Sequence, residues 1–399
     1  MSYRADPHFL TELKKYGTVN IESCFNCGNC TAVCPLSTEE DNFPRRMIRY
    51  TQIGMKEKLL SSKELWMCYH CGECTTTCPR QADPGEFMAA ARRYAIAGYD
   101  RLGLAKLLYT SSTFTILFLI GLAAVLGLYI YSFHGPMPGD ALRLFEFIPS
   151  EVIHDFGVIA GIIIILVAFA GMVKMALNIS KERKVPKDSR LNWLGAMWET
   201  IGVEVLGQRR YRKDCEAYSQ EQRWYKQKWF VHASILWGFL GLFLATAMDY
   251  LLELLGVKPT GTWVPIWYPV RLLGTLAGVL LMYGVSAAML RRLKKADETS
   301  TYSTPSDWAF LILLWLGGLT GFVLEVAIYL PQPHAWSYWM LLAHLIVVGE
   351  LLILLPFSKF AHAIYRTTAL YVHALKPLSK VEPAGAGDQE EVHVGSYST

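Results

Sequence analysis

The sequence contains few charged residues for its length. Only 18% of its 399 residues are Asp, Glu, Lys or Arg, whereas a soluble domain carries about 25%. Hydrophobic residues make up 52% and collect in blocks, several of them long enough to cross a bilayer, which takes about 20 apolar residues. This composition excludes a single soluble domain and indicates a membrane protein.

Features of several other protein classes are also missing. No apolar segment opens the chain, so we expect no secretory signal peptide. Eight of the nine cysteines lie in two tight runs, which does not fit a secreted disulfide framework. The sequence has no G-x-G-x-x-G dinucleotide fingerprint and no Cys-Cys-Gly motif for a substrate-reducing site. We therefore expect no catalytic residues for substrate chemistry, and we expect no nucleic-acid partner.

The two cysteine runs carry the clearest chemical signal. Residues 24–35 and 68–79 both have the spacing C-x2-C-x2-C-x3-C-P, which is used for [4Fe–4S] clusters. A tight loop with a cysteine at every third position wraps three corners of a cubane, and the fourth cysteine ligates the other cluster. Gly28 and Gly72 fit the sharp backbone path of such loops. The predicted ligands are Cys24, Cys27, Cys30 and Cys78 for one cluster, and Cys68, Cys71, Cys74 and Cys34 for the other.

Zinc is the alternative occupant of a cysteine-rich site. Structural zinc takes four ligands, typically from two separate C-x2-C pairs, and two four-cysteine runs that each end in proline fit this poorly. The runs repeat with an offset of 44 residues, and the stretch Pro44–Lys63 between them is predicted to be helical. The pattern favours an α-helical ferredoxin domain over residues 1–105. Cys215 is predicted to be a spare loop thiol.

Six apolar blocks follow this domain. Each is long enough for a transmembrane helix, and none shows the period-two alternation of a membrane barrel strand. The blocks cover about residues 114–133, 156–173, 230–248, 270–290, 308–330 and 338–363. We therefore predict an all-α chain with a six-helix membrane bundle over residues 106–375 and a disordered cytoplasmic tail over residues 376–399.

Lys and Arg residues lie mainly in alternate connections between the blocks. The stretches 181–228 and 291–295 are basic, and the connections on the other side contain little positive charge. Because basic loops stay on the cytoplasmic side, we expect both termini and the iron–sulfur domain in the cytoplasm. The chain is then a multi-pass protein of the cytoplasmic (inner) membrane, in contact with lipid.

Four of the ten histidines lie in or beside the apolar blocks, namely His154, His232, His344 and His362. One such histidine alone would more often form a helix–helix hydrogen bond, but ionisable groups at membrane depth are functional candidates. Four imidazoles suffice for two b-type haems. Depth pairs His154 with His344 near the outer face, and His232 with His362 near the inner face. On one sixth helix, His344 and His362 would be five turns, or about 27 Å, apart on one face.

These residues also carry a family resemblance. The helical block resembles the cytochrome b subunit of respiratory nitrate reductase, whose last haem-binding helix has two histidines spaced like His344 and His362. The cysteine domain resembles the iron–sulfur C subunit of heterodisulfide reductase. Their fusion resembles the membrane-bound C subunit of the quinone-interacting membrane-bound oxidoreductase (Qmo) family. In nitrate reductase cytochrome b both partner histidines lie on one helix, whereas His154 and His232 lie on two, so quinol-site residues do not carry over.

The resemblance implies an electron-transfer subunit. It would pass electrons between menaquinone and soluble flavin/iron–sulfur subunits that serve adenylylsulfate reductase in sulfate respiration. A heterodisulfide reductase-type membrane subunit with another membrane electron carrier is the alternative that the sequence leaves open. An ion transporter would need intramembrane carboxylates such as Glu325, Glu350 and Asp249, which we instead interpret as quinone-site or haem-propionate neighbours, or as interface groups. We expect a quinone beside the outer haem, where Glu325 is the candidate for handling its proton. Glu350 is a further candidate, and Lys174, near the inner haem, is the candidate for an alternative inner-side pocket.

Overall fold

The computed structural model describes residues 4–38, 41–182, 192–214, 223–296 and 301–375. Every regular element in these ranges is a helix, which confirms the predicted all-α class. The predicted tail and Cys215 lie outside the described residues. The amino-terminal part contains α1 (Phe9–Leu13), η1 (Lys14–Tyr16), η2 (Ile21–Ser23), α2 (Asn29–Ala32), α3 (Arg45–Gln52), α4 (Lys56–Leu60), α5 (Glu64–Met67), α6 (Glu73–Thr76), α7 (Pro84–Tyr99) and α8 (Leu104–Thr110).

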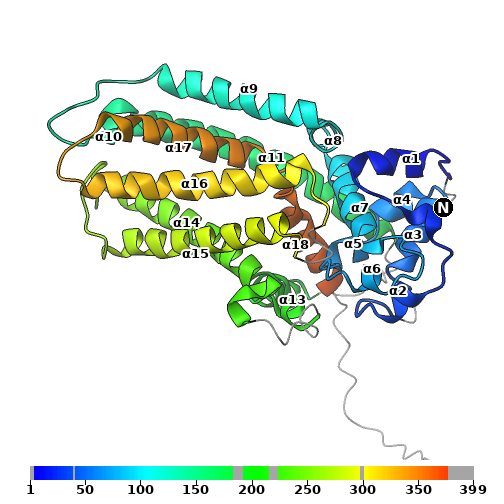
Figure 1. Ribbon diagram of the computed structural model, residues 1–399. Helices are drawn as coiled ribbons and strands as arrows, with labels where there is room; N and C mark the ends of the chain where they lie inside the picture. The colour runs from blue at the N-terminus through cyan, green and yellow to red at the C-terminus, as the bar shows by residue number, and fades with distance from the viewer. Residues whose placement is uncertain (1–3, 39–40, 183–191, 215–222, 297–300, 376–399) are drawn as a thin grey trace, which may run out of the picture.

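Six described helices are long and apolar enough to cross a membrane, as the sequence predicts. They run alongside one another, with the short amino-terminal helices gathered at one end (Figure 1). The six are α9 (Ser112–Tyr131), α11 (Ser150–Glu182), α14 (Lys228–Leu254), α15 (Pro269–Leu293), α16 (Pro305–Tyr329) and α17 (Ala335–Ile353). The remaining elements are α10 (Leu144–Phe147), α12 (Trp193–Met197), the π-helix η3 (Trp198–Leu206), α13 (Arg209–Asp214), η4 (Trp224–Lys226) and α18 (Ala361–Ala374).

The sixth predicted block is not a single helix. The helix α17 ends at Ile353, turns occupy residues 354–360, and α18 begins at Ala361. Pro356 explains the break, because proline lacks an N–H donor and its ring clashes with the preceding helical turn. His344 therefore lies on α17 and His362 on α18. The prediction that five straight turns place both on one helix face is wrong.

Small residues bring α14 and α15 very close together. A Cβ atom at Gly238 would lie 2.5 Å from the backbone nitrogen of Leu281, and one at Gly284 would lie 2.9 Å from the backbone nitrogen of Ile235. Membrane helices commonly associate through such small residues, since the backbones can then touch. The contact holds α14, the helix of His232, in a defined position.

Aromatic rings join the amino-terminal part to α18. Tyr365 of α18 packs against Trp66 of α5 and Tyr99 of α7, with ring centroids 5.4 Å and 5.0 Å apart. All three side chains are buried, and aromatic groups of this kind contribute a large buried apolar area each. The cysteine-bearing part is therefore packed firmly on the membrane part.

A group of three charges around the buried Asp307 strengthens the same junction. Arg93 of α7 donates to one carboxylate oxygen of Asp307 in α16 at 2.9 Å. Lys359, in the turns after α17, lies 2.9 Å from the other oxygen. Asp307 thus connects the amino-terminal part, the fifth span and the bend that follows the sixth.

We expect Asp307→Ala to destabilise the folded protein by about 3–5 kcal/mol, because the buried Arg93 and the partly exposed Lys359 then lose their shared counter-ion. Thermal unfolding of the detergent-solubilised chain measures this. Lys14→Ala is the control: its ion pair with Glu22 is solvent-exposed, with side chains 40% and 55% accessible, so its loss should cost about 0–1 kcal/mol. Equal unfolding temperatures for the two variants would contradict the role of Asp307.

Candidate iron–sulfur and haem sites

The two cysteine loops adopt the same backbone conformation. Gly28 and Gly72 have φ values of +96° and +101°, and Asn26 and His70, two residues earlier, have φ values of +61° and +57°. Each loop leads into a short helix, α2 or α6, and the bounds of these helices differ by the same offset as the cysteines. Glycine adopts a positive φ without steric cost, so the sharp turns expected at Gly28 and Gly72 are confirmed.

Backbone N–H groups point at the cysteine sulfurs of both loops. The amides of Asn26 and His70 donate to Sγ of Cys24 and Cys68, with N···S distances of 3.5 Å and 3.4 Å. These contacts occupy equivalent positions in the two runs. Hydrogen bonds to the sulfurs stabilise thiolate charge and help to set the reduction potential of a cluster. Both loops thus direct a backbone donor at a sulfur that is a predicted cluster ligand.

A cavity of about 360 Å³ is lined by four cysteines, Cys34, Cys68, Cys71 and Cys74. One of them, Cys34, comes from the first run and the other three come from the second. This is the crossed ligand set that the sequence predicts for one cluster. Burial, together with the charges of Cys68 and Cys71, raises the pKa of the Cys34 thiol to about 12. Positive charge from bound metal would lower the pKa of this thiol again, because metal ligation deprotonates thiols.

The other predicted set is assembled in the same crossed way. Burial raises the pKa of the Cys30 thiol, and the charges of Cys24, Cys27 and Cys78 add to this effect. The eight clustered cysteines are all free thiols. Within the described ranges, no three His, Cys, Asp or Glu side chains converge tightly enough to hold a single metal ion. This spacing favours a cluster that spreads its ligands over several iron corners rather than one zinc ion.

The rings of the two predicted inner histidines lie next to each other in an edge-to-face arrangement. His232 of α14 and His362 of α18 have ring centroids 6.2 Å apart, with ring planes at 66°. Because metal–imidazole bonds are about 2.0–2.1 Å long, this separation leaves room for one iron between the rings. His362 Nδ1 lies 2.6 Å from the carbonyl oxygen of Lys359. Metal-bound histidines usually donate their second ring N–H to such an acceptor, which leaves Nε2 for iron.

Gln208 orients the other ring of this pair. Its side-chain nitrogen lies 3.0 Å from His232 Nδ1, while its Oε1 is buried without a hydrogen-bond partner among the described residues. Amide oxygen and nitrogen are assigned from hydrogen bonding, and exchanging them gives Oε1 the N–H of His232. Sequence reasoning missed Gln208, because it belongs to no motif and is placed by the turn after η3, where its φ is +48°.

The predicted outer histidines are not in contact with each other. His344 Nδ1 lies 2.8 Å from Oγ1 of Thr320 on α16. His154 on α11 packs edge-on against Tyr250, with ring centroids 4.4 Å apart. Among the described residues no ring contact joins His154 to His344. Their assignment as a ligand pair stays a prediction.

The three candidates for a quinone site differ in their surroundings. Glu325 accepts a hydrogen bond from Oγ1 of Thr275 at 2.6 Å. Lys174 donates to the carbonyl oxygen of Gly98 at 2.6 Å and so ties α11 to α7. Glu350 is buried in α17, and its Oε1 has no hydrogen-bond partner in the described part of the chain. Two of the three polar groups are therefore already engaged.

Two tyrosines connect the inner histidine pair to the second cysteine loop. Tyr69, next to Cys68, stacks on Tyr211 of α13 at 5.4 Å between centroids, and Tyr211 contacts the His232 ring at 5.4 Å. Arg366 of α18 lies 3.9 Å from the Tyr69 ring centroid and donates to the carbonyl oxygen of Cys68 at 3.1 Å. The candidate haem site and the candidate cluster site are therefore neighbours.

Comparison with known proteins identifies both parts of the chain. The family described as Citrate utilization protein B matches residues 116–382, more than half of the 399 residues. The chain belongs to this family. A 4Fe-4S dicluster domain family matches residues 20–82, which include all eight clustered cysteines.

Three curated relatives agree with these matches. Citrate utilization protein B of Escherichia coli is 31% identical over 118 residues, covering 29% of this chain and 30% of that protein. The C subunit of H(2):CoB-CoM heterodisulfide,ferredoxin reductase from Methanothermobacter thermautotrophicus is 36% identical over 62 residues, covering 16% of this chain and 34% of that protein. The iron-sulfur C subunit of CoB--CoM heterodisulfide reductase from Methanopyrus kandleri is 32% identical over 70 residues, covering 16% of this chain and 36% of that protein. The chain thus spans about a third of each relative's length. No solved structure matches significantly.

These findings confirm the coarser predictions. The chain carries a [4Fe–4S] dicluster domain similar to the C subunit of heterodisulfide reductase, and its six candidate spans support a multi-pass membrane protein. For the membrane part, the matching family is Citrate utilization protein B. The resemblance of this part to nitrate reductase cytochrome b stays a prediction.

Proposed function

We propose that this chain is the membrane subunit that passes electrons between menaquinone and soluble flavin/iron–sulfur partner subunits. The observation that carries the proposal is the inner histidine pair, His232 and His362, which reaches the Cys68 loop through two tyrosines. Two b-type haems and two [4Fe–4S] clusters, when bound, supply one-electron carriers. The contacts between the histidine pair, the two tyrosines and the Cys68 loop support an order of these groups from the membrane to the amino-terminal domain.

Polar residues around the inner sites would tune the bound groups. The carbonyl of Lys359 and the side chain of Gln208 hold the two imidazoles in orientation. Arg92 and Arg366 both donate to the carbonyl oxygen of Cys68, at 2.9 Å and 3.1 Å. Net charge and hydrogen bonding near a cluster set its potential, so these two cations favour the reduced form of the second cluster.

The exposure of the first cysteine loop supports its use as the docking site for the soluble partner. Phe25 corresponds to Tyr69 in the 44-residue repeat, and the two have opposite surroundings. Tyr69 is covered by Arg366 and Tyr211 of the membrane part, whereas Phe25 is 61% exposed and Cys27 beside it is also exposed. One loop therefore contacts the membrane part and the other faces outward, as an electron relay requires.

The finer identity rests on the fusion of the two domains. That fusion supports a Qmo-type subunit linked to adenylylsulfate reductase. Alternate loops are rich in Lys and Arg, and since such loops stay on the cytoplasmic side, both termini would lie there as well. The second candidate is a heterodisulfide reductase-type membrane subunit that uses another membrane carrier. It is favoured by the relatives of the cysteine domain, which are themselves C subunits of heterodisulfide reductases.

A reduced-minus-oxidised spectrum of the purified full chain tests the proposal. We expect b-type haem bands, together with iron and sulfide sufficient for two cubanes. Menadiol, a soluble naphthoquinol, should reduce the haem without any added protein. Absence of haem would contradict the proposal, and a haem that dithionite reduces but menadiol does not would favour the second candidate.

A further inference from the structure

A row of large apolar side chains is exposed on the helical segment that α12 and η3 form together, residues 193–206. Leu194 and Trp198 are the most open of them, at 82% and 72% exposure. From Leu194 onward the members follow the i, i+3, i+4, i+7 spacing of one helix face. This apolar row consists of Trp193, Leu194, Met197, Trp198 and Ile201. The surface of a soluble protein seldom gathers so much exposed apolar area in one place.

The rest of the segment is packed against protein. Ala196 is buried at the end of α18. Glu204 is buried as well, and it accepts a hydrogen bond from the hydroxyl of Tyr69 at 3.4 Å. Both carboxylates of the segment, on Glu199 and Glu204, pair with Arg209, at 3.9 Å and 3.4 Å. These contacts fix the segment in one orientation, with the apolar row turned outward.

Contacts with the beginning of α14 give the depth of this region. The side-chain nitrogen of Gln208, two residues after η3, lies 3.0 Å from Nδ1 of His232. The guanidinium of Arg212 in α13 lies 4.8 Å from the ring centroid of Trp229, the second residue of α14. Figure 1 shows α13 at the same end of the bundle as the amino-terminal helices. The segment therefore lies level with the first turns of a candidate span, and not out in the aqueous phase.

Exposed cations and a further tryptophan lie at the same level. Arg212, Arg223 and Lys226 are exposed, and so is Trp224 between the last two. The carbonyl oxygen of Lys226 accepts a hydrogen bond at 2.8 Å from Arg291 in the last turn of α15, so η4 also lies where the spans end. Tryptophan, arginine and lysine beside an apolar helix face are typical of segments in the lipid headgroup layer. Cations in that layer attract anionic lipid.

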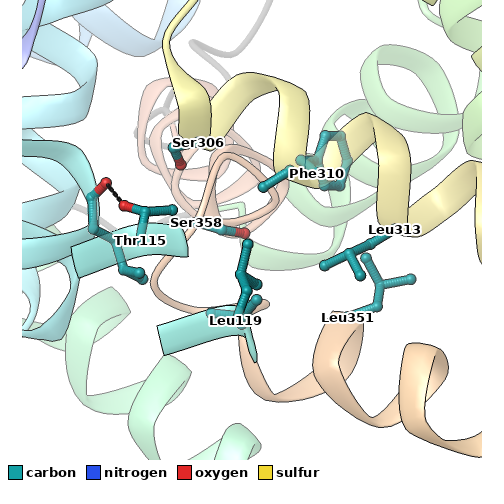
Figure 2. Close-up of a pocket in the computed structure, with 10 residues that line it drawn as sticks. Thr115, Leu119, Ser306, Phe310, Leu313, Leu351 and Ser358 are labelled. Carbon is teal, nitrogen blue, oxygen red and sulfur yellow. Dashed lines mark hydrogen bonds between the residues drawn. The ribbon is translucent and has the colours of Figure 1, made fainter. Parts of the chain in front are cut away.

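The cavity at this end of the bundle is too small for lipid. Figure 2 shows this cavity between α8, α9 and α16, where Leu119 and Phe310 form part of an apolar wall and Thr115 donates to the carbonyl oxygen of Leu108 at 2.7 Å. It has room for about one water molecule. An acyl chain does not fit there, so a lipid at this end of the bundle would bind on the outside, where the apolar row lies.

We propose that segment 193–206 lies in the membrane surface on the side of the amino-terminal domain. The apolar row lies among lipid acyl chains, and the exposed cations around it bind the phosphates of anionic lipid. Depth favours lipid over a soluble partner protein, because the row is level with the first turns of α14, where a bilayer begins. The positive charge of the surroundings favours anionic lipid over neutral lipid.

Photo-crosslinking of the full chain in lipid nanodiscs tests this contact. The photoreactive residue p-benzoylphenylalanine replaces Leu194, and the nanodiscs contain equal amounts of phosphatidylcholine and phosphatidylglycerol. We expect phospholipid adducts, detected by mass spectrometry, in a yield similar to that from Ile165, which is 66% exposed on the candidate span α11. Phe25, in the exposed cysteine loop of the amino-terminal domain, is the aqueous control, and its yield should be about tenfold lower or less.

The role of charge is tested in the same nanodiscs. Phosphatidylglycerol adducts should outnumber phosphatidylcholine adducts at Leu194. Changing both Arg223 and Lys226 to glutamine should lower this ratio about threefold or more, because each cation near the surface attracts anionic lipid. Lys15→Gln, at an exposed lysine of the amino-terminal domain, should leave the ratio unchanged.

Three outcomes would overturn the proposal. The first is a phospholipid yield at Leu194 as low as that at Phe25. The second is an adduct of Leu194 with a co-purified protein in place of phospholipid, which would make the apolar row a docking surface for a partner. The third is the same ratio of the two lipids in the unsubstituted chain and in the variant without Arg223 and Lys226. The readout uses neither haem nor quinone, so it does not depend on the outcome of the spectral test of the proposed function.

Discussion

Replacing His362 with alanine should remove one of the two proposed haems, and replacing His232 should remove the same one. The two rings lie 6.2 Å apart on different helices, so each variant would leave one iron with a single imidazole. The haem content of the purified chain should fall from two to one in either variant, and the double variant should lose nothing more. Absorption spectra and paramagnetic resonance of the bis-imidazole signal measure this.

His373 provides a matched control on the same helix. It lies near the end of α18 and contacts Lys63 rather than another histidine, so His373→Ala should retain both haems. By contrast, His344→Ala should remove the other haem. If His362→Ala and His344→Ala both kept two bis-imidazole haems, the ligand assignment would be wrong. Loss of both haems in His232→Ala alone would indicate collapse of the bundle rather than loss of a ligand.

Cys78→Ser should damage the cluster whose other ligands come from the first run, although Cys78 belongs to the second. The reason is the crossed arrangement, in which the charges of Cys24, Cys27 and Cys78 act together on Cys30. The reciprocal change, Cys34→Ser, should damage the cluster in the cavity lined by Cys68, Cys71 and Cys74. Iron and sulfide should fall by about half in each variant, since one of two clusters is lost.

Paramagnetic resonance of the reduced protein distinguishes the two losses. Each variant should retain one cubane signal, and the retained signals should differ between Cys78→Ser and Cys34→Ser. Cys215→Ser, outside both runs, should retain both signals. Loss of the same signal in Cys78→Ser and Cys68→Ser would show that each run binds its own cluster. Zinc in place of iron would contradict the cluster assignment altogether.

The two cysteine loops show which structural features can be predicted from a short stretch of sequence. Their conformation repeats with positive φ at Gly28 and Gly72 and with N–H···S contacts to Cys24 and Cys68. All of these features lie within a few residues of each motif; the spacing predicted the sharp turns at the two glycines, and the structure added the N–H···S contacts. The repeat did not predict that Phe25 is exposed while Tyr69 is covered. That difference arises because the membrane part contacts only one of the two loops.

The sequence by itself determined the six spans, the all-α class and the two cluster loops, because apolar length and cysteine spacing are local properties. The sequence paired His232 with His362 by depth, but only the tertiary structure gave the distance between their rings, the contact of Gln208 with one of them, and the separation of α17 from α18. Pro356 is present in the sequence, but hydropathy is averaged over many residues and one proline changes it little. The apolar block was therefore predicted as a single helix across the bend. Side-chain partners far apart along the chain depend on how helices cross, and no local pattern carries that information.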